Sequence, residues 1–169
     1  MHMLGRTAAE LDELVRRFDA CSLPKDEWTH AAHLAVGLWH VERYGEEEAL
    51  PRLRRGIRHL NESHGTINSA TSGYHETITR AYVALLSAFL ARSKGASIAH
   101  RLASLLDGPL SSREVLLTFY SRPRLICAEA RLIWVEPDLA PISLQAVLGS
   151  SDSAGGGRAS PRAISDAEG

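Results

Sequence analysis

The chain has 169 residues, of which 44% are hydrophobic and 23% charged, which fits one globular domain with an ordinary core. Its 19 Lys and Arg against 20 Asp and Glu give a net charge of −1, so the overall basic field typical of nucleic-acid-binding proteins is absent. No apolar run approaches the roughly 18 residues of a membrane span, and no secretory signal peptide is recognisable. Cys21 and Cys127 lack metal-site or disulfide spacing. We therefore expect a cytoplasmic protein without a nucleic-acid or membrane partner.

The N-terminal part of the sequence predicts three helices. Thr7 and Glu10 have the spacing of a capping box, and apolar residues then recur at helical intervals up to Phe18. Pro24 separates this helix from a second, which carries a cluster of histidines and is expected to end at Gly45. A third helix follows up to about Gly65. Its arginines at positions 52, 54, 55 and 58 favour a solvated helix face over a phosphate site.

A polar loop and a strongly apolar helix come next. Residues 66–73 are mostly small and polar, which is typical of a loop. The following helix is predicted to include His75, which a rotation of 100° per residue places at the centre of its apolar face. A histidine buried there needs either a hydrogen bond or a metal ion, because an unpaired buried imidazole costs about 1–3 kcal/mol.

Shorter helices are predicted after residue 97, after a capping-box sequence at 111–114, and over about 125–133. Residues 149–169 contain few large apolar side chains and are expected to form a disordered tail after a helical domain at 1–148. Strand-like alternation is confined to residues 132–135. The predicted fold is therefore all-α, a single-domain bundle of six or seven helices.

Several short motifs resemble those of a family of small bacterial proteins of uncharacterised function. They are a Leu-Pro turn, Thr-His-x-x-His-Leu on a helix, Gly-Tyr-His-Glu-Thr opening another, and Ala-Arg followed by Pro-Asp-Leu. The resemblance covers about residues 18–142 and implies an all-helical fold, with no established activity. It marks His30, His33, Gly73, Tyr74, His75, Glu76, Arg131, Pro137 and Asp138.

The histidines suggest a metal site. His30 and His33 are one turn apart beside the buried face of their helix and form a plausible half-site for a divalent ion. His75 would complete a three-histidine centre for Zn²⁺ or Fe²⁺ with positions open for water or substrate. His40 lies two turns beyond His33 and is not assigned to this centre. The alternative is that these histidines are core residues bonded to the backbone.

Three further residues have a functional and a structural interpretation. Glu76 is either a general base acting through metal-bound water or an acidic residue suited to a helix N-terminus. Tyr74 either donates a proton to substrate or packs at the helix start. Arg131 either forms an ion pair with Asp138 or Glu76, which is favoured, or binds an anionic substrate.

The leading hypothesis is a helical metalloprotein, possibly an enzyme, that activates water or a small ligand. The competing hypothesis is a non-catalytic module with a pocket for a small anionic molecule. In both cases the expected partner is a small molecule.

Overall fold

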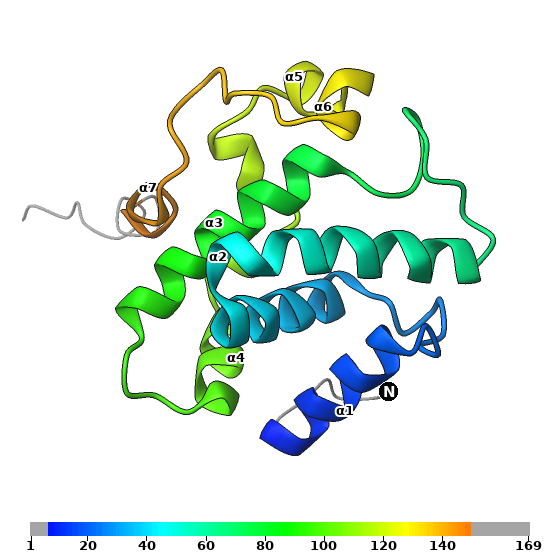
Figure 1. The fold of residues 1–169 in the computed structure, drawn as a ribbon. Helices are drawn as coiled ribbons and strands as arrows, with labels where there is room; N and C mark the ends of the chain where they lie inside the picture. The colour runs from blue at the N-terminus through cyan, green and yellow to red at the C-terminus, as the bar shows by residue number, and fades with distance from the viewer. Residues whose placement is uncertain (1–6, 150–169) are drawn as a thin grey trace, which may run out of the picture.

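The computed structural model describes residues 7–149 of the chain. This part contains seven α-helices, two short 3₁₀ helices and no strand (Figure 1), which confirms the predicted all-α fold. The predicted tail starts at the last residue of the final helix, and its other residues lie outside the described part. The elements are α1 (Ala8–Asp19), α2 (His30–Ser63), α3 (Glu76–Arg92), α4 (Ile98–Asp107), η1 (Pro109–Ser111), η2 (Val115–Thr118), α5 (Arg122–Ile126), α6 (Ala128–Leu132) and α7 (Leu144–Gly149).

The N-terminal helix α1 begins as the sequence predicts. The Thr7 hydroxyl accepts a hydrogen bond from the Glu10 amide, and the Glu10 carboxylate accepts one from the Thr7 amide. This reciprocal pair satisfies two of the amides that a helix N-terminus leaves unbonded. The apolar face of α1 packs against α2 and ends at Phe18, which is fully buried.

The long helix α2 is two helices that meet at Gly45. At that residue φ is +74° and ψ is +170°, a conformation that is essentially restricted to glycine. The chain reverses there, so the two halves of α2 lie side by side (Figure 1). The predicted end of the second helix at Gly45 is confirmed. Gly56 in the second half allows α1 to approach closely, since a Cβ there would lie 2.5 Å from Phe18 Cζ.

Helix α3 packs against α2 and begins at Glu76, one residue later than the periodicity suggested. His75 is the N-cap, with extended backbone angles, and its Nδ1 accepts a hydrogen bond from the Ile78 amide. The predicted position of His75 on the apolar face of this helix is therefore wrong. A rotation of 100° per residue applies only inside a helix, and the cap lies outside it.

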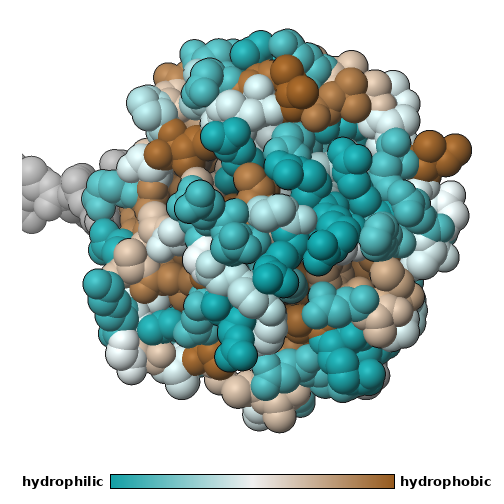
Figure 2. Space-filling model, viewed as in Figure 1, coloured by the Kyte–Doolittle hydropathy of each residue, from teal (hydrophilic) through white to brown (hydrophobic). Residues whose placement is uncertain are grey.

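The C-terminal part differs most from the prediction. The expected helix after residue 114 is the 3₁₀ helix η2, and the expected helix at 125–133 is divided into α5 and α6 at Cys127. Helix α7 was missed. Ile126 on α5 and Leu132 on α6 are exposed hydrophobic residues. Figure 2 shows scattered hydrophobic patches in a surface that is otherwise largely hydrophilic. Within the described residues, no helix combines the length and the apolar character needed to cross a membrane.

Candidate functional site

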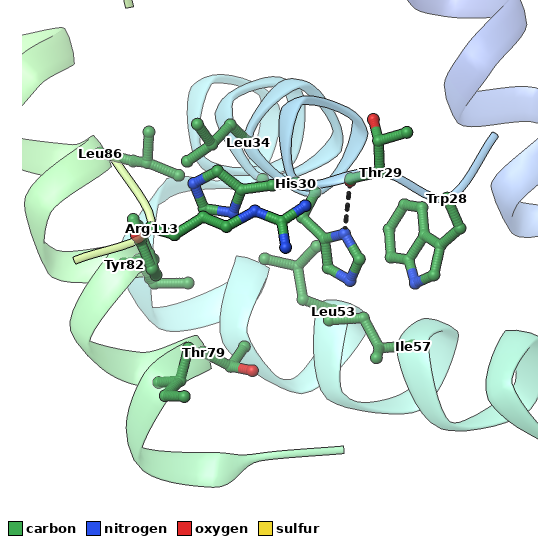
Figure 3. Close-up of a pocket in the computed structure, with 14 residues that line it drawn as sticks. Trp28, Thr29, His30, Leu34, Leu53, Ile57, Thr79, Tyr82, Leu86 and Arg113 are labelled. Atoms are coloured by element: carbon green, nitrogen blue, oxygen red, sulfur yellow. Dashed lines mark hydrogen bonds between the residues drawn. The ribbon is translucent and has the colours of Figure 1, made fainter. Parts of the chain in front are cut away.

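A cavity of about 370 Å³ lies between α2 and α3. Its wall combines aliphatic side chains with polar ones from the start of α2, from α3 and from the segment that carries Arg113 (Figure 3). Both the volume and this mixture are typical of small-molecule sites. The lining residues are Trp28, Thr29, His30, His33, Leu34, Gly37, Leu53, Ile57, Ile78, Thr79, Tyr82, Val83, Leu86 and Arg113.

Thr29 positions the two histidines because it is the N-cap of α2. Its hydroxyl accepts a hydrogen bond from the Ala32 amide, which starts the helix so that His30 and His33 both reach the cavity. His33 Nδ1 donates to the Thr29 carbonyl oxygen at 2.7 Å, shown as the dashed line in Figure 3. A carbonyl can only accept, so the neutral imidazole of His33 carries its proton on Nδ1 and leaves the lone pair of Nε2 available. The prediction that this histidine pair shares one site is consistent with the structure.

Both imidazoles are biased towards the neutral form. Burial lowers the pKa of His30, and the nearby Arg113 guanidinium lowers it further. The pKa of His33 is also lowered, mainly because neighbouring protein atoms exclude water from part of its ring. That ring lies against the Trp28 indole with 3.8 Å between centroids, although the residue keeps an exposed edge. Above pH 7 the fixed positive charge at this cavity is therefore that of Arg113.

Two buried nitrogen atoms in residues of the cavity wall have no hydrogen-bond partner within the described chain. They are Trp28 Nε1, which can only donate, and His30 Nε2. The Ser111 backbone lies close enough to the His30 ring to interact with it, so Trp28 Nε1 is the clearer of the two. An unsatisfied buried polar group costs about 1–3 kcal/mol, so such atoms are uncommon unless a ligand or water satisfies them. These two nitrogens lie in residues of the polar part of the cavity wall.

Arg113 comes from the segment between η1 and η2 and was not singled out from the sequence. It is exposed at the cavity, and Figure 3 shows its guanidinium beside the His30 ring. Among residues 7–149, no carboxylate lies within ion-pair distance of it. The same segment is held to α3 by the Tyr82 hydroxyl, which donates to the Ser112 carbonyl oxygen at 3.3 Å. An unpaired guanidinium at an apolar cavity is suited to binding an anion.

The structure does not bring His75 to this cavity. Its Nε2 donates to the Leu125 carbonyl oxygen at 3.0 Å, and its Nδ1 is the acceptor that caps α3. Both ring nitrogens are thus committed to the backbone, and neither can bind a metal ion without breaking a cap or a tertiary bond. The predicted cluster of His30, His33 and His75 is therefore wrong. In the described part of the chain, no three His, Cys, Asp or Glu side chains are arranged to hold a metal ion.

Two histidines fall short of the three protein ligands typical of catalytic zinc sites. The predicted Zn²⁺ or Fe²⁺ cofactor thus has only the His30–His33 half-site to support it.

Glu76 and Tyr74 belong to a buried ion-pair cluster and do not line the cavity. Arg54 binds both carboxylate oxygens of Glu76, at 2.6 and 2.8 Å, and the Tyr74 hydroxyl donates to the same carboxylate at 3.0 Å. Burial alone would raise the pKa of Glu76, but Arg54 and Tyr74 hold it below its ordinary value. Burial raises the pKa of Tyr74 to about 12. The structural alternatives fit these contacts, since Glu76 lies in the first turn of α3 and residues 7–149 contain no three-histidine centre for it to serve.

Arg131 has neither of its two predicted partners. Its guanidinium donates to the Gly73 carbonyl oxygen at 2.8 Å and so secures the loop that leads into α3. Asp138 instead accepts hydrogen bonds from the amide and hydroxyl of Ser121, the N-cap of α5. The favoured ion pair of Arg131 is thus wrong, and so is its role at the binding site, because it does not line the cavity.

The arrangement offers an apolar floor, two neutral imidazoles, an indole donor and an unpaired cation. Comparisons of the chain with models of protein families, with curated proteins and with solved structures find no match, so the family resemblance of its motifs stays a prediction.

Proposed function

We propose that the protein binds a small amphipathic carboxylate in the cavity between α2 and α3, as a binding module and not as a metalloenzyme. The observation that carries the proposal is the unpartnered buried indole nitrogen, Trp28 Nε1, beside the unpaired Arg113 in the wall of a largely apolar cavity. A ligand oxygen would satisfy the indole donor, and an apolar body would cover the aliphatic wall.

The charge distribution selects an anion. Arg113 has no carboxylate partner among the described residues, and both histidines are biased towards neutrality by their surroundings. A carboxylate at Arg113 would form a charge-assisted hydrogen bond, which is about twice as strong as a neutral one. The apolar body of the ligand would then lie along aliphatic side chains of the wall such as Leu53, Ile57 and Leu86 (Figure 3).

We propose that the protein binds this ligand in the cytoplasm. The two cysteines, Cys21 and Cys127, form no disulfide, which suits a reducing environment. The small molecule is the only partner that the proposal requires.

Replacement of Arg113 by glutamine is expected to weaken the binding of octanoate about tenfold, the equivalent of one charged hydrogen bond of roughly 1.4 kcal/mol. Octanol has the same apolar body and no charge, so its weaker binding should not change. Isothermal titration of both ligands measures the difference. Arg43→Gln is the matched control, since Arg43 is exposed on α2 and outside the cavity.

Equal loss of octanoate and octanol affinity in Arg113→Gln would contradict a carboxylate at this residue. Failure of the unmodified protein to bind either ligand would contradict the amphipathic character assigned to the site.

A further inference from the structure

A second, smaller cavity of about 180 Å³ lies where the end of α1 meets the two halves of α2. It shares no lining residue with the first. The residues that line it are Asp19, Cys21, His40, Tyr44, Arg52, Arg55, Gly56 and His59.

The cavity is built by the hairpin of α2. Arg52, Arg55 and His59 lie at positions i, i+3 and i+7 of the second half, so they share one helix face. Gly56 on the same face admits Phe18, which brings the end of α1 against these side chains. The first half of α2 contributes His40. Three segments thus place two guanidinium groups and two imidazoles around one space.

Arg52 is held in place without an anionic partner. Its guanidinium carbon lies 4.0 Å from the centroid of the Tyr44 ring, a cation–π contact that fixes the side chain. Its Nε is buried and has no hydrogen-bond partner within residues 7–149. Arg52 and Arg55 also have no carboxylate within ion-pair distance there, whereas Arg54 between them is paired with Glu76. A positioned guanidinium without a carboxylate partner is suited to binding an anion.

The remaining charges favour an anion. Asp19 is the one acidic side chain of the lining; its carboxylate is 59% exposed and lies 3.9 Å from His40 Nε2. Burial lowers the pKa of His40, and its Nδ1 donates to the Val36 carbonyl oxygen. The two arginines therefore outweigh Asp19 by one charge, and an anion with several acceptor oxygens, such as a phosphoryl group, can bind both guanidinium forks at once.

We infer that this cavity binds a phosphoryl group, supplied by inorganic phosphate or by a small phosphomonoester. The arginines in the second half of α2 then have different roles. Arg54 holds α3, Arg58 lies over the Tyr74 ring at 5.0 Å, and Arg52 with Arg55 binds the anion.

The test is isothermal titration of the full chain at low ionic strength with inorganic phosphate and, separately, with glycerol 3-phosphate. One phosphoryl group should bind per chain. Arg52→Gln and Arg55→Gln should each weaken binding at least tenfold, roughly one charge-assisted hydrogen bond. Arg55 is exposed, so its replacement tests the site without disturbing the core. Asp19→Asn should strengthen binding about threefold, because it removes the opposing charge.

Arg43→Gln, which changes the net charge equally from outside the cavity, should leave the affinity unchanged. Tighter binding of glycerol 3-phosphate would identify a phosphomonoester as the source, and tighter binding of inorganic phosphate would identify the free ion. No binding of either compound at about 10 mM would overturn the inference. Equal losses in Arg43→Gln and Arg52→Gln would also overturn it, since general charge would then explain the affinity.

Discussion

Replacement of Arg54 by alanine is expected to lower the free energy of unfolding by about 3 kcal/mol. The reason is the burial of its partner, since the Glu76 side chain is only 10% exposed and would lose both of its guanidinium hydrogen bonds. The Tyr74 hydroxyl would remain as a hydrogen-bond donor to that charge, and the nearby charge of Arg58 would add a weaker stabilisation. The estimate lies at the low end for broken buried pairs, because Arg54 itself is 39% exposed. Urea denaturation at pH 7 measures the change.

Arg43→Ala serves as the control, with an expected change within about 0.5 kcal/mol. Glu76→Gln removes the buried charge together with its main interactions, so its cost should be smaller than that of Arg54→Ala. A loss in Arg54→Ala no larger than that of the control would show that the pair does not hold α3 to α2.

Acidification is expected to destabilise the protein through His75. Burial, followed by the charge of Arg131, lowers the pKa of this imidazole to about 4. The unfolded chain therefore binds the proton first, so the contribution of His75 to stability is complete above its ordinary pKa of about 6.5 and is lost as the pH falls towards 4. The loss approaches about 3 kcal/mol for a shift of this size. Physically, a proton on Nδ1 would face the Ile78 amide, which is itself a donor.

His75→Asn isolates this effect, because asparagine is a favoured N-cap that does not titrate in this range. Urea denaturation of both proteins at pH 7 and pH 4.5 should show a smaller acid-induced loss of stability in the variant. The comparison of the two proteins removes the contributions of the other histidines and of the carboxylates to the acid-induced loss, because those groups titrate in both. An identical acid-induced loss in the two proteins would contradict the capping role of neutral His75.

Local signals predicted the first half of the fold well. The capping box of Thr7 and Glu10, the periodicity of α1 and the helix end at Gly45 each depend on residues within one or two turns. The C-terminal part depends on tertiary contacts instead. Cys127 ends α5 and caps α6 with its thiol, a role that is not predicted from a cysteine in the sequence. The short α7 has few residues over which a periodicity could be detected.

The candidate site was also predicted only in part, because local spacing indicates some of its residues and tertiary packing brings in the others. His30 and His33 are one turn apart, so their shared face follows from the sequence. His75 was misplaced by a single residue at a helix boundary, where sequence patterns are least reliable. Arg113 lies about 80 residues from the histidines, in a connecting segment without periodicity, and only the packing of that segment on Tyr82 brings it to the cavity. The one available signal was its position directly after two serines in an exposed turn, which does not distinguish it from other surface arginines.

The indole N–H groups provide the most direct test of the ligand site. Of the three tryptophans, Trp39 donates to Asp12 at 2.8 Å and Trp134 donates to Glu136 at 2.7 Å, whereas Trp28 Nε1 has no partner in the described chain. Titration of ¹⁵N-labelled protein with octanoate, followed by the three indole resonances, should shift the Trp28 signal saturably and leave the other two in place. The same titration of Arg113→Gln should require about tenfold more octanoate. An unmoved Trp28 resonance, or equal shifts of all three, would contradict carboxylate binding in the cavity between α2 and α3.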